Sequence, residues 1–195
     1  MAYISVAEAK AYIGGESGIS DDALIKVIID GAESFIESYT GRDFKADTDA
    51  TRYFDSNADT VDKLLILDGD LCSITSVVTN ADDGSSGTTI TSSEYITIPR
   101  NRTPYYALKL LTSSSNLWTY TDDPEMGIEI TGKWGWSTSP PADIEAAMKD
   151  IVKSVYRSRD ANADTAILSS GMVITANDIP KITLTTLNGY RRIPV

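Results

Sequence analysis

The sequence predicts an α+β fold: a small helical bundle interrupted by an antiparallel β-sheet insertion, with an extended C-terminal arm. Three observations predict this class. Apolar residues repeat at helical spacing near both ends of the chain, residues alternate with a period of two in the middle, and the pattern weakens after Asp160. We therefore expect N-terminal helices in 1–50, a β insertion in 51–132, a return loop and long helix in 133–160, and the arm in 161–195.

Boundary residues predict the first two helices. Ser5 and Glu8 have the spacing of a capping box and predict a short first helix. Ser20 is the expected N-cap of a second helix, which Gly41 ends. Gly31 inside this helix costs about 1 kcal/mol relative to Ala, so we expect it to allow close packing of another helix. The apolar or small residues of the predicted face are Leu24, Val27, Ile28, Gly31, Ala32, Phe35, Ile36 and Tyr39.

The middle of the chain predicts antiparallel strands. Segments rich in β-branched and aromatic residues alternate with turns rich in Gly, Asp, Asn and Ser, and the connections are too short for crossover helices. Segment 80–87 is the clearest turn and predicts an exposed hairpin tip. The predicted strands are 52–54, 63–67, 73–79, 94–98, 105–111 and 127–131.

A junction returns the chain to the bundle. The last strand is expected to end at Gly132, and Pro140 and Pro141 then begin the longest late helix. Residues 161–180 predict a loop with one strand at 172–175. Segment 181–187 has two interpretations: its β-branched residues favour a strand, whereas the flanking proline and Asn-Gly pair favour a short helix.

Composition argues against several function classes. No apolar run approaches the ~20 residues that span a bilayer, and the N-terminus lacks the pattern of a secretory signal. Cys72 is the only cysteine and is expected to be a small buried residue. Histidine is absent, which removes the commonest general base and metal ligand.

The charge of the chain is unevenly distributed. The net charge is -11, and such an acidic surface repels nucleic-acid phosphates. Residues 1–150 hold 11 Lys and Arg against 25 Asp and Glu, whereas residues 151–195 hold 6 against 3. A basic end on an acidic body suggests that this end docks on an acidic partner.

No segment carries a convincing catalytic or ligand-binding motif. Carboxylates cluster at 68–70, 82–84 and 122–125, and each cluster stands where Asp is a normal turn residue. The glycine-rich stretches lack phosphate-loop and dinucleotide spacing. We therefore predict no catalytic, cofactor-binding or metal residues and no enzymatic activity.

Three segments together resemble the tailed-bacteriophage head–tail connector (adaptor, or head-completion) proteins. Residues 24–44 resemble the N-terminal helix of that family. Residues 130–136, followed by Pro141, resemble its Ile-Thr-Gly-x-x-Gly-Trp segment and helix. Residues 187–192 resemble its Leu-x-x-Tyr-Arg-Arg ending.

The resemblance implies a structural protein of the virion neck that assembles in the host cytoplasm. Such proteins form a ring, expected to be a dodecamer, that binds beneath the portal protein and presents a platform to the stopper or tail-completion protein. DNA passes through the channel of the ring without specific binding, and no membrane is involved. The residues expected to dock on the portal are Tyr190, Arg191 and Arg192, and those expected to pack between subunits are Gly31, Phe35, Trp134 and Trp136.

Two other classes remain as alternatives. A carbohydrate- or surface-binding β module of a virion would expose Trp118, Trp134 and Trp136 on one face. A metal-dependent hydrolase would be built on the aspartate clusters. Packing of the tryptophans in the core or between subunits is the interpretation we favour.

Overall fold

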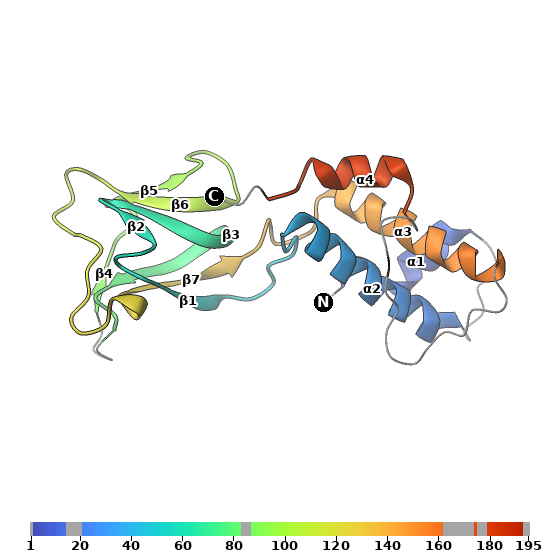
Figure 1. The fold of residues 1–195 in the computed structure, drawn as a ribbon, viewed down its shortest axis with the longest axis horizontal. Coiled ribbons are helices and arrows are strands. Elements are labelled where there is room, and N and C mark those ends of the chain that lie inside the picture. The colour runs from blue at the N-terminus through green and yellow to red at the C-terminus, as the bar shows by residue number, and fades with distance from the viewer. Residues whose placement is uncertain (1, 15–20, 83–86, 162–173, 175–178, 193–195) are drawn as a thin grey trace. The chain divides into compact units, whose positions relative to one another are not determined.

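The chain folds into two compact units, each of which is described by itself. The computed structural model describes residues 2–14, 21–82, 87–161, 174 and 179–192 (Figure 1). The helical unit consists of Met1–Phe44 and Pro140–Val195, and the sheet unit of Lys45–Ser139. Helices and antiparallel strands are both present, so the predicted α+β class is confirmed.

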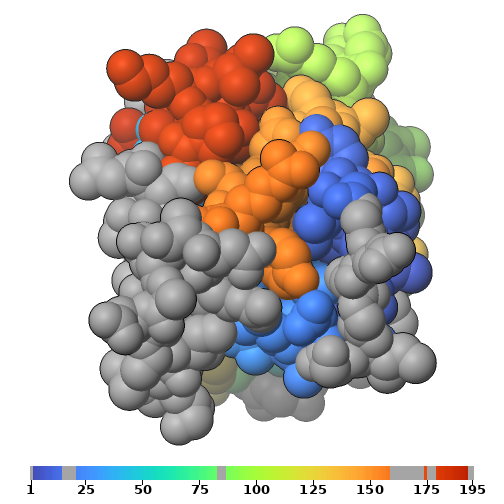
Figure 2. Space-filling model, turned by 90° about the vertical axis from the view of Figure 1, so that its right-hand side faces the viewer, coloured from blue at the N-terminus to red at the C-terminus, as the bar shows by residue number. Residues whose placement is uncertain are grey.

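The helical unit is built around α3. Its helices are α1 (Val6–Ile13), α2 (Asp22–Thr40), α3 (Ala142–Ala161) and α4 (Lys181–Asn188). Helix α3 contacts the other three, and Figure 2 shows it between α4 and α1 on one face of the unit. The large side chains buried in this unit include Ile25, Ile28, Ile29, Ile36, Phe44, Ile144, Met148 and Ile151.

Local capping fixes the helix ends largely as predicted. The Glu8 N–H donates to Ser5 Oγ at 3.2 Å and the Ser5 N–H donates to Glu8 Oε2 at 2.7 Å, which confirms the capping box. Gly41 ends α2 at a φ of 66°, a left-handed conformation that glycine adopts without a Cβ penalty. Ser20, the predicted cap, lies outside the described residues, and the N-cap position of α2 is Asp21.

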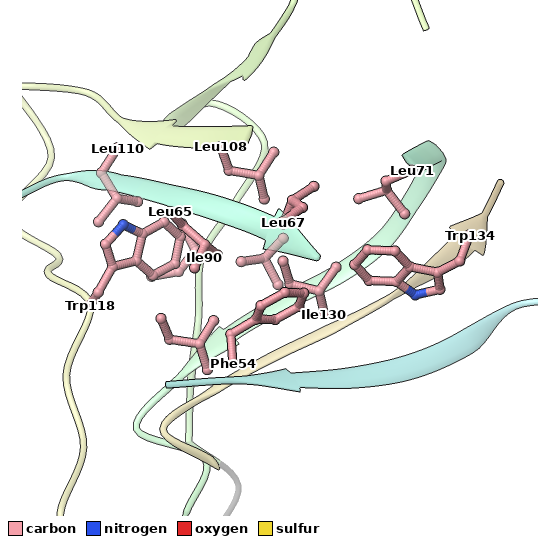
Figure 3. Close-up of a cluster of buried hydrophobic side chains, with 12 residues drawn as sticks. Phe54, Leu65, Leu67, Leu71, Ile90, Leu108, Leu110, Trp118, Ile130 and Trp134 are labelled. Carbon is pink, nitrogen blue, oxygen red and sulfur yellow. The ribbon is translucent and has the colours of Figure 1, made fainter. Parts of the chain in front are cut away.

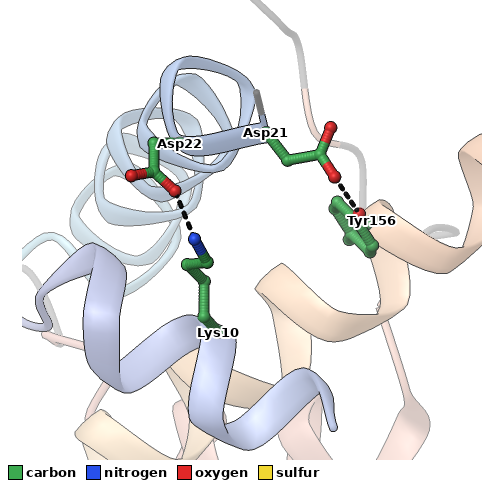
Figure 4. Close-up of polar contacts among 4 residues, drawn as sticks. All are labelled: Lys10, Asp21, Asp22 and Tyr156. Atoms are coloured by element: carbon green, nitrogen blue, oxygen red, sulfur yellow. Dashed lines mark hydrogen bonds and ion pairs between the residues drawn. The ribbon is translucent and has the colours of Figure 1, made fainter. Parts of the chain in front are cut away.

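Two polar contacts attach the start of α2 to its neighbours (Figure 4). Lys10 Nζ of α1 lies 2.6 Å from Asp22 Oδ1. The Tyr156 hydroxyl of α3 donates to Asp21 Oδ2 at 2.9 Å. Adjacent carboxylates at the positive end of the α2 dipole thus each hold a different helix.

The buried face of α2 is rotated from the predicted one. Its buried residues are Ile25, Ile28, Ile29, Ala32, Ile36 and Thr40. Val27, predicted in the core, is 40% exposed, and Gly31 and Phe35 are half-buried. The helix is apolar around more than half of its circumference, so its contacts with α1, α3 and α4, and not its periodicity, select the face.

The segment with two interpretations, which lies within the predicted arm, is a helix. Residues 181–188 form helix α4, so the helical interpretation of 181–187 is the correct one. Pro180 stands at its N-cap and Gly189 at its C-cap, while Thr183 and Leu187 are buried. The predicted strand at 172–175 falls outside the described residues except for Ile174.

The sheet unit is a seven-stranded antiparallel sheet. The path of strands runs β1-β7-β3-β6-β5, and β2 and β4 pair with β3. The two ends of the unit lie together, because the Ala46 N–H donates to Ser137 O at 2.9 Å and β1 pairs with β7. The strands are β1 (Ala50–Phe54), β2 (Thr60–Val61), β3 (Leu64–Thr79), β4 (Thr88–Thr89), β5 (Tyr95–Ile98), β6 (Tyr105–Leu110) and β7 (Ile128–Trp134), with a 3-10 helix η2 (Pro124–Met126) before β7.

Strand β3 replaces two predicted strands. The sequence predicted strands at 63–67 and 73–79 with a turn at 68–70, but β3 is continuous over 16 residues. Its first half pairs with β6 and its second half with β7, with register shifts between the two halves. These irregularities bend the strand, which lets polar residues occupy its middle without ending it.

Strand β7 runs beyond its predicted end. It continues through Gly132 to Trp134. A Cβ on Gly132 would lie 2.2 Å from the backbone oxygen of Ser73, so glycine is required there by the close approach of β3. The glycine that predicted the end of a strand is a packing residue inside it.

The core of the sheet unit contains two of the three tryptophans (Figure 3). Trp118 and Trp134 are 8% and 6% exposed. Their indole N–H groups donate to the carbonyl oxygens of Lys63 and Ala50 at 3.0 and 2.9 Å. A carbohydrate-binding face of three exposed tryptophans is therefore absent, because two of the three are buried. Cys72, predicted to be buried, is half-buried.

A carboxylate anchors the loop beside the β3–β4 hairpin. Thr79 pairs with Thr88, as the predicted hairpin requires, and 83–86 lie outside the described residues. The Asp82 carboxylate accepts backbone N–H groups from residues 121–123 at 2.6 to 3.1 Å. Desolvation acts to raise its pKa, but the N–H groups of 121, 123 and 122 outweigh it and lower the pKa to about 2.

Within the described residues, no group of three or more Cys, Asp and Glu side chains is arranged to hold a metal ion. None of the helices seen in this part of the chain has the length and apolar character needed to cross a membrane.

Candidate assembly site

The chain after α4 folds back onto the end of α2. The Arg192 N–H donates to the carbonyl oxygen of Thr40 at 2.8 Å. Arg42 Nε donates to the carbonyl oxygen of Tyr190 at 2.5 Å. The bond from Arg192 satisfies a carbonyl at the α2 C-terminus, where no intrahelical donor remains. Residues 189–192 are thus part of the helical unit, whereas the sequence predicted an extended arm from residue 161.

Tyr190 is held from two sides. Its hydroxyl donates to the Asp143 carboxylate, with distances of 2.8 and 2.7 Å to the two oxygens. Its ring packs edge-on against Phe44 at 5.4 Å between centroids, and Phe44 packs edge-on against Tyr3 at 6.1 Å. Burial and then the bond to Asp143 raise the pKa of Tyr190 to about 12. Tyr190 therefore acts as an internal clamp between α3 and the end of α2.

Arg191 faces outward beside this clamp. Its guanidinium lies 5.5 Å from the centre of the Tyr39 ring, and its side chain is exposed. The Tyr39 hydroxyl donates to Asn188 Oδ1 at 2.8 Å. The structure thus brings the three predicted docking residues together at the end of α2, with Arg191 the one presented to solvent and Arg192 half-buried.

A partly exposed apolar stripe leads along α2 to this point. It consists of Val27, Gly31, Phe35 and Tyr39, one helical turn apart. Phe35 and Tyr39 stack with centroids 5.5 Å apart and an interplanar angle of 20°. We call these four residues the α2 stripe. It contains Gly31 and Phe35, two of the residues predicted to pack between subunits.

A pair of carboxylates on the opposite side of α2 from the stripe was not identified from the sequence. Glu33 and Glu37 lie one turn apart on α2, and the Tyr3 hydroxyl donates to Glu37 Oε1 at 2.8 Å. Burial and then the charge of Glu37 raise the pKa of Glu33 to about 7. Like charges four residues apart were the available signal, since they are unfavourable on a helix.

Comparison with known protein families identifies the family of this chain. The model of the head completion protein family matches residues 2–193. The chain belongs to the head completion protein family. The resemblance to head–tail connectors is therefore confirmed.

Solved structures share the fold of this head completion protein. One is the neck of an empty gene transfer agent (GTA) particle computed with C6 symmetry, with a TM-score of 0.58 and 15% identity, covering 99% of this chain and 91% of that one. Another is the virion of a native GTA particle, with a TM-score of 0.58, 16% identity and the same coverage. Among curated proteins the comparison finds no match.

Membership of the family makes this head completion protein a structural component of the head–tail region of a virion. The structure agrees with a packing role for its conspicuous residues. Trp134 packs 5.7 Å from Phe54 and carries the Arg52 guanidinium 4.4 Å from its ring centre, all within the sheet unit. Trp136 follows β7 and is half-buried. These two tryptophans belong to the sheet unit, whereas Gly31 and Phe35 belong to the helical unit.

Proposed function

We propose that this head completion protein forms a ring beneath the portal of the capsid, extends the DNA channel and provides the platform for the stopper or tail-completion protein. The observation that carries the proposal is the α2 stripe, where the side chains of Val27, Phe35 and Tyr39 are partly exposed on the helix that the family resemblance singled out. A monomer gains nothing from leaving stacked rings at its surface, whereas a neighbouring subunit can bury them. The expected ring is a dodecamer.

The C-terminal end of the helical unit is the proposed portal contact. Arg191 is exposed there, and Tyr190 and Arg192 hold its backbone in place. Residues 151–195 carry 6 Lys and Arg against 3 Asp and Glu, so this end attracts an acidic surface. In this arrangement Tyr190 positions the segment and Arg191 makes the contact.

The location we propose is the virion neck, reached by assembly in the host cytoplasm. One of the structures with this fold is itself the neck of a GTA particle. The net charge of -11 supports passage of DNA without binding, because a negative channel wall repels phosphates.

The portal contact is tested with one charge reversal and its matched control. We expect Arg191→Glu to lower the amount of chain bound to portal by about tenfold, in line with the loss of one well-placed charge contact. Lys181→Glu makes the same charge change at another exposed position of the same unit and is expected to bind as the wild type does. If both variants lose portal binding equally, or if neither loses it, the role of Arg191 is contradicted.

The ring is tested by electron microscopy of the assembled particle. We expect density for this chain as a closed ring directly beneath the portal. Density elsewhere in the virion, or a single copy per particle, contradicts the proposed function.

A further inference from the structure

We infer that the sheet units of neighbouring copies join head to tail, with the basic, apolar face of the β5–β6 hairpin of one copy docked on the acidic end of the sheet unit of the next. This inference rests on the proposed ring and names the contact that closes it. Both surfaces belong to one unit and are described within it.

The first surface is an apolar face of the sheet with a basic rim. Directly paired residues share a face, and Leu108 and Leu110 point into the core, so their neighbours Ile96, Ile98 and Lys109 point outward. Leu64 and Ile66 of β3 pair with Lys109 and Ala107 and extend the same face.

This outer face carries positive charge that the chain does not neutralise. Arg100 and Arg102 lie in the connection between β5 and β6 and, like Lys109, are exposed. Residues 95–110 contain these three cations and no Asp or Glu. None of the three forms an ion pair within the part of the chain that the structure describes. We call Ile98, Arg100 and Arg102, which lie at or beside the connection between β5 and β6, the hairpin surface.

The second surface combines apolar side chains with negative charge. Around η2, Met126 is 46% and Tyr120 39% exposed. Asp122, Asp123 and Glu125 are exposed beside them, and residues 120–126 contain no Lys or Arg. These carboxylates also make no ion pair among the described residues. We call Tyr120, Asp122, Asp123, Glu125 and Met126 the acidic end.

The two surfaces lie at opposite ends of the sheet unit. Tyr105 begins β6 opposite Leu71, which also pairs with Trp134 at the end of β7. The hairpin connection is therefore level with the end of β7, whereas η2 immediately precedes its start (Figure 1). Within one copy the two surfaces cannot meet.

Opposite placement of opposite charges selects the geometry of the contact. A twofold contact centred on either surface alone sets cations against cations or carboxylates against carboxylates. In a head-to-tail contact each hairpin surface meets an acidic end, and apolar side chains on both sides are buried together. Repetition of a head-to-tail contact closes into a ring when the rotation allows it.

Disulfide trapping between full-length copies tests the contact directly and captures weak association. In a Cys72→Ser background we combine a tagged Arg102→Cys chain with an untagged Asp123→Cys chain under mild oxidation. We expect tagged–untagged dimers to exceed either homodimer by about tenfold, because only the mixed pair places the two thiols at one interface. Ser113→Cys, exposed outside both surfaces, is the control and is expected to cross-link with neither partner above background.

Charge exchange tests the electrostatic part of the contact. We expect Arg100→Glu/Arg102→Glu and Asp122→Lys/Asp123→Lys each to weaken self-association about tenfold by sedimentation, and an equimolar mixture of the two to restore it. The substituted side chains carry none of the bonds to Asp82, which come from backbone N–H groups, so both variants are expected to fold as the wild type does.

The outcomes separate this inference from the proposed function. A trapped pair no more abundant than the homodimers overturns the head-to-tail contact, as does a mixture that associates no better than either charge variant alone. A chain found in a ring beneath the portal without the Arg102–Asp123 cross-link overturns the contact and leaves the proposed function standing. A specific Arg102–Asp123 cross-link in a chain located elsewhere in the virion supports the head-to-tail contact and overturns the proposed function.

Discussion

The clamp between Tyr190 and Asp143 offers a direct measurement of how firmly the C-terminal segment is held. Tyr190→Phe removes only the hydroxyl that donates to Asp143, and Asp143→Ala removes the acceptor. The two variants and their combination form a double-mutant cycle that isolates the pair, because the effects of each change on α3 itself cancel.

The geometry sets the size of the expected coupling energy. Distances of 2.8 and 2.7 Å to the two oxygens describe a short bond to a charged acceptor, and such bonds contribute about 1.5–3 kcal/mol when buried. Asp143 is exposed and Tyr190 is half-buried, so solvent screening reduces the expected coupling to about 1 kcal/mol.

Urea unfolding followed by helix circular dichroism measures this energy at neutral pH, where Tyr190 is protonated in both the folded and unfolded states. The pair Tyr39 and Asn188 serves as the control, since it is a neutral and exposed bond of 2.8 Å with an expected coupling of about 0.5 kcal/mol. A Tyr190–Asp143 coupling below about 0.3 kcal/mol, or no larger than the control, refutes the view that the segment is an integral part of the helical unit.

Three further predictions concern residues inside the two units. Burial and Glu37 raise the folded-state pKa of Glu33, so its protonated form contributes stability below about pH 4.5 that is lost as the pH rises through about 7; Glu33→Gln is expected to raise the free energy of unfolding at pH 8 by about 1 kcal/mol after allowance for solvent screening, and urea titrations that show parallel pH profiles contradict this. Gly132→Ala is expected to lower that free energy by more than about 2 kcal/mol, because its Cβ would lie 2.2 Å from the Ser73 oxygen; a melting temperature equal to that of the wild type is the contrary result. The folded-state pKa of Asp82 is lowered to about 2, so its stabilisation is present above pH 3.8 and is lost as the pH falls through about 2; Asp82→Asn is expected to melt below the wild type at pH 6 and close to it at pH 2, and an unchanged difference in calorimetry rejects this account.

Features set by local chemistry were predictable from the sequence. The capping box at Ser5, the left-handed Gly41 and the proline-started α3 each depend on residues within one or two turns. The family resemblance likewise rested on short segments near α2, β7 and the C-terminus, and the family match over residues 2–193 confirms it.

Features set by distant contacts were not predictable. The 16 residues of β3 form one strand because β6 and β7 pair with its two halves, and nothing within 68–70 reveals those partners. The face of α2 depends on three other helices. Tyr190 pairs with a carboxylate 47 residues away, so sequence spacing alone indicated a docking residue and not a clamp.

The bond between Ala46 and Ser137 reduces the entropic cost of inserting the sheet unit between the helices. If Lys45–Ser139 were a flexible loop, bringing its ends together would cost on the order of 3 kcal/mol more in entropic free energy than closing a two-residue link. Once the sheet has folded, its two ends already lie together, and the helices on either side are joined as though by a short turn. The sheet unit can therefore vary in length between related chains with little effect on the stability of the helices, provided that its first and last strands stay paired.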